Sequence, residues 1–468
     1  MSPLSFNARL AWILTALLLA AACAPRTPMP GATARPAATA TAETAPTALP
    51  TVNAPSTPEP ALEPRPTPVA VGTRDPATTD RHLRIFEQLW NTVDTQYVYP
   101  DFGGIDWSAA YDEFQARIER GLSDEAFWKA MSELVARLSD DHSTFLTPEQ
   151  AREEDEKLSG NLFYVGIGIY AAVQTEKKQA VIFSVFPGSP AQEAGLSAHD
   201  ALLSIDGQPV VNADGSDALD RLRGPADSVV TLTVRSPSGA PRDVEVTRRR
   251  VNGALTATGR ALRLEASERR IGYLMIPTLW DASIERSTRQ ALIDLTNAGA
   301  LDGLIIDMRV NGGGTSANLL SLLGFFTAGQ HGEFAGRDQT RLLQVTADPV
   351  GNSHSVPLVI LVGSDTQSYA EVFSGVLREA GRAHLVGQTT AGNIETLYGY
   401  DFEDGSRAWI ARETFVPLGG DDWEATGLAP DVPVDADWDE FTDADDPYIA
   451  AALDLLNLPV NASRPSNR

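Results

Sequence analysis

Cysteine is nearly absent from this chain, and histidine is sparse. The 468 residues include one cysteine, Cys23, and six scattered histidines. A single thiol excludes an intrachain disulfide and a zinc-thiolate site, and the lack of a His-Glu-x-x-His spacing argues against a zinc hydrolase. The sequence therefore indicates no metal and no other cofactor.

Basic residues are also few. Lys and Arg total 37 against 62 Asp and Glu, a formal net charge of −25. Such a chain is repelled by phosphate backbones and anionic membrane surfaces, so nucleic acid is not an expected partner. The four lysines are Lys129, Lys157, Lys177 and Lys178. No lysine is therefore available after residue 178.

One largely apolar run lies near the amino terminus. It covers residues 10–22, follows Arg9 and ends in small residues. This length is short for a membrane span and typical of a secretory signal peptide, which we assign to residues 1–22. The sequence Leu-Ala-Ala-Ala-Cys23 resembles a bacterial lipoprotein signal. That resemblance implies lipidation of Cys23 and anchoring on the outer side of the cytoplasmic membrane or in the periplasm; the alternative is an ordinary signal peptide with an incidental cysteine.

Residues 23–78 are rich in Ala, Pro and Thr, with 13 prolines between residues 24 and 78. This composition cannot bury a core, and we predict a disordered tether. About 55 residues of flexible chain span roughly 40 Å. The tether would hold the folded part clear of a membrane.

Three segments of different pattern follow. Residues 79–158 carry apolar residues at helical spacing and predict a helical subdomain, with Ser123 as a helix N-cap. Residues 159–252 are rich in strand patterns. Residues 253–460 alternate strands and helices, which predicts a largely parallel sheet covered by helices. The predicted fold class is multidomain α/β.

The β-rich segment resembles a PDZ domain. The motifs are Gly-Ser-Pro-Ala-x-x-Ala-Gly-Leu196 and, after it, Asp200-x-Leu-Leu-Ser-Ile-Asp-Gly. Such domains add an extended peptide as a strand and hold its terminal carboxylate with backbone N–H groups. The resemblance implies that this peptide-binding loop comprises Tyr164, Val165, Gly166, Ile167, Gly168 and Ile169. The alternative is a PDZ-like domain that only packs against its neighbour.

A serine stands at a strand-to-helix turn near the carboxyl end. The apolar run 357–362 predicts a buried strand, and helical periodicity begins just after Ser368. A helix N-terminus offers free N–H groups and a positive dipole end, both suited to an oxyanion. Ser368 is therefore a candidate nucleophile, and the alternative is that it only caps the helix.

A glycine-rich turn lies before another predicted helix. Gly312, Gly313 and Gly314 lack the spacing of a nucleotide-binding loop. Glycines there let backbone N–H groups approach an oxyanion without a side chain in the way. We expect Gly312 or Gly313, together with the N–H of Tyr369 after the serine, to form an oxyanion hole.

Residues from about 80 to 435 resemble the carboxyl-terminal processing (tail-specific) protease family. The matching motifs are Asp141-His-Ser-Thr-Phe-Leu-Thr-Pro, the PDZ insertion, Ile306-Asp-Met-Arg-Val-Asn-Gly-Gly-Gly, Ser368-Tyr-Ala-Glu-Val-Phe and Gly427-Leu-Ala-Pro-Asp. The resemblance implies a ClpP/crotonase-like core with Ser368 as nucleophile.

The sequence departs from the common family pattern at the general base. The usual lysine position, 25 residues after the serine, is Asn393. The tricorn-like branch of the family implies a Ser-His-Glu arrangement instead, which falls on His142 as base and Glu424 as its partner. These residues lie 226 positions before and 56 positions after Ser368. Four other carboxylates remain candidates for orienting the histidine, namely Asp140, Asp141, Glu371 and Glu395.

The favoured interpretation is an exported, lipid-anchored serine endopeptidase that forms an acyl-enzyme with extended polypeptide. Its partners would be polypeptide substrates or protein carboxyl termini. The main alternative is a non-catalytic relative that binds peptides through its PDZ surface, favoured by Asn393. A weaker alternative is a carrier of apolar ligands.

Overall fold

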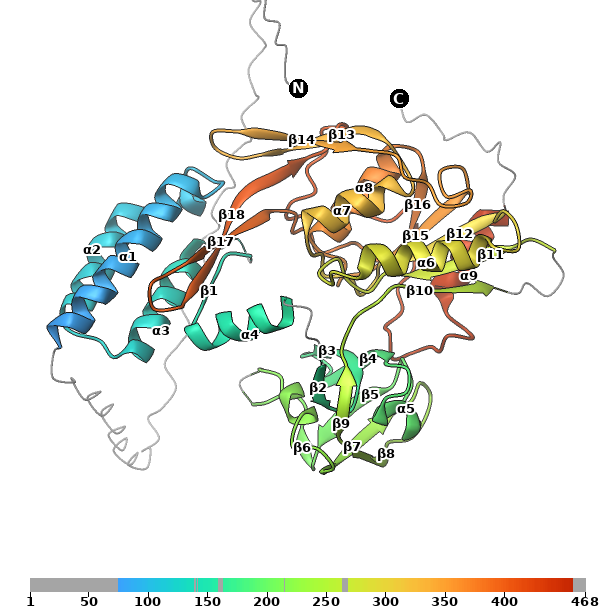
Figure 1. Cartoon of the computed structure of the whole chain (residues 1–468), viewed down its shortest axis with the longest axis horizontal. Coiled ribbons are helices and arrows are strands. Elements are labelled where there is room, and N and C mark those ends of the chain that lie inside the picture. Colours follow the sequence, from blue (N-terminus) through green and yellow to red (C-terminus); the bar gives the residue numbers. More distant parts are fainter. Residues whose placement is uncertain are drawn as a thin grey trace, which may run out of the picture. The chain divides into compact units, whose positions relative to one another are not determined.

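A computed structural model describes residues 75–457 except 139, 141, 159–162, 214 and 263–267 (Figure 1). The predicted signal peptide, Cys23 and most of the tether lie outside these residues. The first helix, α1 (Pro76–Gln96), is capped by the Asp75 side chain, which accepts from the N–H groups of Ala77 and Thr78. Residues 76–78 are therefore helical, although the sequence placed them in the tether.

Helices build the amino-terminal part, as predicted. They are α1, α2 (Trp107–Glu119), α3 (Asp124–Val135) and α4 (Pro148–Leu158). Ser123 caps α3 by accepting from the N–H of Ala126, which confirms the predicted cap. Phe86, Phe114 and Phe127 are fully buried between the first three helices. They share one apolar cluster with residues of the strand hairpin whose turn contains Phe402.

The α/β core is built on a six-stranded sheet. Its strand order is β10 (Thr258–Leu262), β11 (Ile271–Met275), β12 (Gly303–Asp307), β15 (Leu358–Val362), β16 (Ala383–Gly387) and β19 (Val432–Pro433). The pairs from β11 to β19 are parallel, and β10 is antiparallel to β11. This confirms the predicted parallel sheet and brings the carboxyl ends of β12 and β15 side by side.

Helices cover both faces of this sheet. Alternate strand residues such as Leu274, Ile306 and Ile360 share a cluster with helices α6 (Ile284–Thr296), α7 (Ser316–Gly324) and α8 (Tyr369–Glu379). The intervening residues, such as Ile305 and Leu361, pack with the closing helix α9 (Pro447–Asn457). Strands buried on both faces read as continuous apolar runs, which explains the pattern at residues 357–362.

A second sheet joins the amino-terminal part to the core. It contains β1 (Thr144–Leu146), β13 (Gly329–Ala335), β14 (Thr340–Val345), β17 (Thr396–Asp401) and β18 (Arg407–Val416). The short strand β1 pairs with β18 in antiparallel register, Thr144 opposite Trp409. This pairing holds the chain just after His142 against a strand of the core.

The β-rich domain has two sheets. A small one pairs β2 (Phe163–Gly166) with β9 (Arg249–Asn252). The larger one runs β3 (Ile169–Gln174), β4 (Gln179–Val185), β5 (Ala201–Ile205), β7 (Val229–Arg235) and β8 (Arg242–Thr247), with β6 (Gln208–Pro209) beside β5 and the short helix α5 (Pro190–Glu193). Strands β2 and β3 are separated at Ile167 and Gly168.

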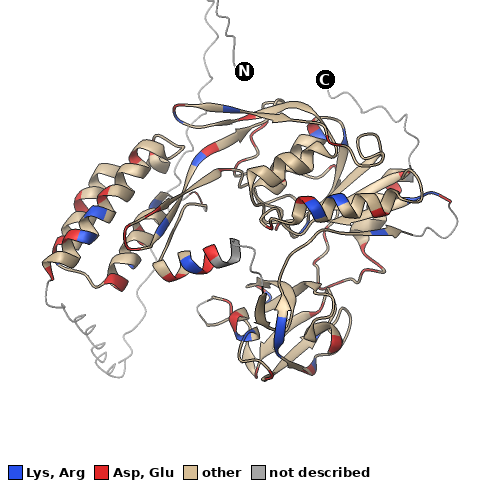
Figure 2. Ribbon diagram, viewed as in Figure 1, with Lys and Arg blue, Asp and Glu red and all other residues tan. Residues whose placement is uncertain are grey.

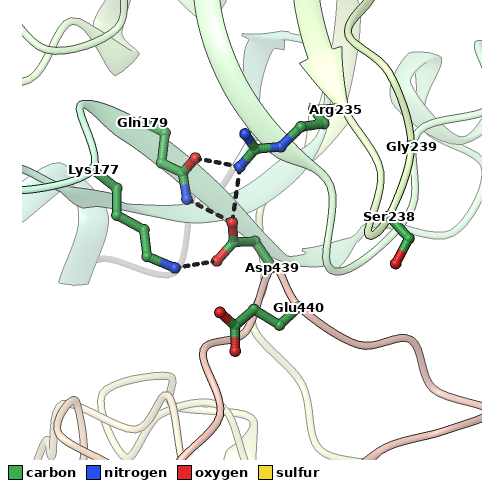
Figure 3. Close-up of a pocket in the computed structure, with 7 residues that line it drawn as sticks. All are labelled: Lys177, Gln179, Arg235, Ser238, Gly239, Asp439 and Glu440. Atoms are coloured by element: carbon green, nitrogen blue, oxygen red, sulfur yellow. Dashed lines mark hydrogen bonds and ion pairs between the residues drawn. The ribbon is translucent and has the colours of Figure 1, made fainter.

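A segment of the core near residue 439 contacts this β-rich domain. Asp439 accepts from Lys177 at 2.8 Å, Gln179 at 2.9 Å and Arg235 at 3.0 Å (Figure 3). These residues line a pocket with Ser238, Gly239 and Glu440. Tyr170 also donates its hydroxyl to the carbonyl oxygen of Val310, at 3.2 Å. The β-rich domain is therefore bonded to the chain just before the glycine-rich turn.

Acidic and basic positions are interspersed over most of the ribbon (Figure 2), while β9 carries Arg249 and Arg250 directly after Arg248. This distribution agrees with a chain in which acidic residues are in excess. Within residues 75–457, as far as they are described, none of the helices is long and apolar enough to cross a membrane.

Candidate active site

Ser368 occupies a strained position at the turn between β15 and α8. It is the N-cap of α8, with φ 55° and ψ −129°. A positive φ is uncommon for a residue with a Cβ and persists where surrounding contacts impose it. The Ser368 N–H is held by two acceptors, the carbonyl oxygen of Asn393 at 2.9 Å and a carboxylate oxygen of Glu371 at 3.0 Å. The turn is thus fixed by its own helix and by the loop around Asn393.

Glu371 is the main organiser of this turn. Its side chain is fully buried and accepts from the N–H groups of Ser368, Gly392 and Asn393 and from the hydroxyl of Thr390. Burial raises the pKa of Glu371, while the bonds from Thr390 and Gly392 act in the opposite direction. Glu371 was one candidate partner of His142. The hydrogen bonds of the Glu371 carboxylate instead tie residues 390–393 to the serine turn.

The glycine-rich turn lies directly beside the serine. A Cβ on Gly313 would stand 2.7 Å from the Cβ of Ser368, and Gly313 has φ 87°. A Cβ on Gly314 would stand 1.9 Å from the carbonyl carbon of Leu279, which the turn pairs with through an isolated bridge. Glycine is therefore required for the close approach at both positions.

The backbone N–H groups expected to form an oxyanion hole differ in their availability. The N–H of Gly313 already donates to the Asn311 side chain at 2.9 Å. For Gly312 and for Tyr369 in the first turn of α8, no bond from the backbone N–H is found among the described residues. The N–H groups of Gly312 and Tyr369 are therefore the ones available to an oxyanion, and the missing side chain of Gly313 allows the close approach to Ser368.

His142 lies in a turn formed by a neighbouring carboxylate. Asp140 accepts from the N–H groups of His142 and Ser143, at 3.0 and 2.6 Å, and from the Ser143 hydroxyl. The Ser143 hydroxyl oxygen in turn accepts from the N–H of Ala411 on β18. Asp140 thus fixes the backbone that carries the imidazole. Asp141 is outside the described residues.

Glu395 approaches the imidazole of His142. Its Oε2 lies 3.1 Å from Nδ1 of His142, within ion-pair distance, although neither of these two atoms makes a hydrogen bond within the described residues. The two side chains are 2 % and 13 % exposed. The other carboxylate oxygen accepts from the hydroxyl of Tyr99 at 3.0 Å. Sequence reasoning gave Glu395 only as one of four alternatives and did not find Tyr99, because no local pattern marks either residue.

Glu424 contacts Glu395 rather than taking the place beside Nδ1. Burial, followed by the charge of Glu395, raises the pKa of Glu424 to about 8. Burial acts the same way on Glu395, but the imidazole of His142 and a hydrogen bond with Glu424 outweigh it and lower the pKa of Glu395. A protonated Glu424 therefore donates to an ionised Glu395 near neutral pH. Glu424 also accepts from the N–H of Ile394 at 2.9 Å.

The loop from Thr390 to Glu395 connects these groups. Its first part bonds to Glu371, the carbonyl of Asn393 accepts from Ser368, and its last residue is Glu395. Asn393, at the usual lysine position, keeps a buried Oδ1 without a hydrogen-bond partner among the described residues. The serine turn and the histidine turn are therefore joined through six consecutive residues.

The predicted peptide-binding loop is partly built into strands. Tyr164, Val165 and Gly166 belong to β2, and Ile169 begins β3. Ile167 is buried and its carbonyl accepts from the N–H of Ala191. Gly168 has φ 84°, and its carbonyl accepts from Phe186. Strand β3 lies at the end of its sheet order, which leaves its outer edge without a strand partner in the described part of the chain.

In the part of the chain that the structure describes, no three His, Cys, Asp or Glu side chains form a group that could hold a metal ion.

Three family descriptions match the chain in the order of its parts. Residues 80–136 match the tricorn protease C1 domain, residues 181–236 a PDZ domain, and residues 270–434 peptidase family S41. A carboxyl-terminal-processing protease of Picosynechococcus is 30 % identical over 383 residues, which cover 79 % of this chain and 88 % of that protein. The chain belongs to peptidase family S41. It is a serine-type peptidase with an amino-terminal helical region and a PDZ domain, so the predicted family and fold class are confirmed.

Other relatives of this S41 peptidase agree. A carboxyl-terminal-processing protease of Synechocystis is 28 % identical and shares 80 % of this chain and 86 % of its own. The solved photosystem II D1 carboxyl-terminal processing protease has a TM-score of 0.55 at 25 % identity, covering 76 % of this chain and 93 % of that one. A Bacteroides fragilis protein described as an S41 protease has a TM-score of 0.57 at 16 % identity, covering 79 % and 96 %, and supports the fold alone.

Proposed function

We propose that this S41 peptidase cleaves polypeptides through an acyl-enzyme formed on Ser368, with His142 as general base. The observation that carries this proposal is the loop 390–395, which is hydrogen-bonded to the serine turn through Thr390, Gly392 and Asn393. The same loop ends in Glu395, the carboxylate that faces His142. The absence of lysine after residue 178 leaves the family's common base unavailable. A neutral imidazole is suited to this task near neutral pH.

In this mechanism the Ser368 Oγ attacks the scissile carbonyl carbon while His142 takes the hydroxyl proton. Because Nδ1 faces Glu395, the proton is taken at Nε2. The oxyanion is stabilised by the N–H groups of Gly312 and Tyr369. His142 then gives the proton to the leaving amine, and a water molecule, deprotonated by His142, releases the new carboxyl terminus from the serine.

The proposed substrates are extended polypeptides presented by their carboxyl-terminal ends. The relatives named as carboxyl-terminal-processing proteases and the matched PDZ domain support this class. The outer edge of β3 offers unpaired backbone groups to which such a tail can add as a strand. The loop from Tyr164 to Ile169 precedes that edge.

We further propose that the peptidase acts outside the cytoplasm, held to the membrane by lipid on Cys23. The support is the apolar run that ends in Leu-Ala-Ala-Ala-Cys23 and the Pro-rich segment after it. Partners would then be exported polypeptides.

A peptide-binding protein without peptidase activity remains the second candidate. It is favoured by Asn393 at the position where the common members carry lysine, with an unpaired buried Oδ1 in the described structure. The two candidates differ in whether Ser368 is reactive.

Labelling with a fluorophosphonate separates them. We expect wild type to be labelled and Ser368→Ala not, while Ser374→Ala, which removes a hydroxyl from the same helix, keeps the label. His142→Ala should slow labelling and peptide hydrolysis by about 10²–10⁴-fold, whereas His384→Ala, at an exposed site, should not. An unlabelled, folded wild type would support the peptide-binding alternative. Unchanged rates in His142→Ala would remove this residue as base.

A further inference from the structure

We propose that Glu395 is the residue that positions the imidazole of His142, and that Glu424 acts one step further away by holding Glu395. This inference rests on the proposed function, since it assigns roles around its general base. It differs from the arrangement implied by the family resemblance, in which Glu424 itself partners the histidine.

The contact distances support this order. Glu395 Oε2 is 3.1 Å from Nδ1 of His142. The Glu424 carboxyl instead has as its hydrogen-bond partners the N–H of Ile394 and the side chain of Glu395. Glu395 is also nearly completely buried, so its charge acts on the imidazole with little screening by water. A buried charge needs partners, and His142 supplies one of them.

The other partners of Glu395 fix its rotamer. The Tyr99 hydroxyl donates to Oε1 at 3.0 Å, and Glu424 bonds to the same carboxylate. The titratable groups facing Glu395 are thus His142, Glu424 and Tyr99. The charge of Glu395 also acts on Tyr97. Burial followed by the charge of Glu395 raises the pKa of Tyr99, so this phenol stays a donor over the working range.

The state of Glu424 explains why it cannot take the same role. With its pKa raised to about 8, it is protonated at neutral pH and serves as a donor. A neutral carboxyl does not stabilise an imidazolium by charge, whereas an ionised Glu395 does. The two carboxyls share one proton, so Glu424 acts as a donor and Glu395 carries the negative charge.

Two isosteric substitutions test this division. Glu395→Gln should lower kcat by about 10²–10⁴-fold with little change in KM, because an amide can present its donor to Nδ1 and favour the wrong tautomer. Glu424→Gln should lower kcat by less than about tenfold, because an amide donates to Glu395 as the protonated carboxyl does.

Glu285→Gln, at a half-buried glutamate on α6 that pairs with Arg289, is the matched control for the substitution itself. If Glu395→Gln fails to fold, Tyr99→Phe tests the same point. Loss of the hydroxyl that fixes Glu395 should lower kcat several-fold and leave KM unchanged.

The inference is overturned if the Glu395 variant keeps wild-type kcat, or if the Glu424 variant shows the larger loss. An unlabelled wild type would instead overturn the proposed function, so the two failures are distinguishable.

Discussion

The two sides of the candidate site are built in different ways. Ser368 lies at the start of a long buried helix, and the Glu371 carboxylate that holds it is three residues away on the same helix. His142 lies in a short turn whose connection to the core passes through a three-residue strand, β1. Ser368 is thus fixed mainly by nearby sequence, while the imidazole of His142 depends on contacts between distant parts of the chain.

Disturbing the turn at Ser368 should therefore lower the free energy of unfolding by more than disturbing the turn at His142. Glu371 accepts from four donors at once, of which those of Thr390 and Gly392 are buried, and a buried donor left unpaired costs about 1–3 kcal/mol. The turn at His142 is half-buried and rests on Asp140 and one bond to β18. Three predictions test this contrast.

The largest effect is expected for Glu371→Ala. It leaves the N–H groups of Gly392 and Asn393 and the Thr390 hydroxyl without this acceptor, whereas the Ser368 N–H keeps the carbonyl oxygen of Asn393. The free energy of unfolding should fall by roughly 3 kcal/mol or more. Urea denaturation gives this value, and fluorophosphonate labelling should be lost with it. Glu285→Ala on α6 is the control. A Glu371→Ala protein as stable as wild type would show that this carboxylate does not organise the turn.

An intermediate effect is expected for Asp140→Ala. Its carboxylate accepts from the N–H groups of His142 and Ser143, so the imidazole should lose its position while the fold remains. We expect kcat to fall by about 10–100-fold, since misplacement of a catalytic group by about 1 Å has an effect of this size. The free energy of unfolding should fall by about 1–2 kcal/mol. Steady-state kinetics and denaturation on the same samples check both. A stability loss as large as that of Glu371→Ala would contradict the contrast.

The smallest effect is a pH dependence of stability on the histidine side. The pKa of Glu424 is raised from its ordinary value near 4.5 to about 8 in the folded protein, by burial and then by the charge of Glu395. The folded state therefore holds more protons than the unfolded state between these values, and stability from this group falls as pH rises from about 4.5 to about 8. The Tm of Glu424→Gln minus the Tm of wild type should increase with pH over this window, because only the wild type loses this contribution. A constant difference would show that Glu424 ionises normally.

The sequence predicted the parts whose signals are local. The apolar run of β15, the Ser123 cap and the glycine-rich turn were all placed correctly because periodicity and capping depend on neighbouring residues. The PDZ motifs and the serine turn likewise stand in short continuous stretches. These features established the family and the fold class before any tertiary contact was known.

Tertiary structure decided what lies next to His142. Glu395 stands 253 positions after it and Tyr99 stands 43 before it, and no spacing rule joins residues brought together by β1 pairing with β18. The protonation of Glu424 also follows from burial beside a second carboxylate, which a sequence cannot show. The serine turn could be predicted because a strand-turn-helix is local, whereas the surroundings of His142 exist only once distant strands have paired.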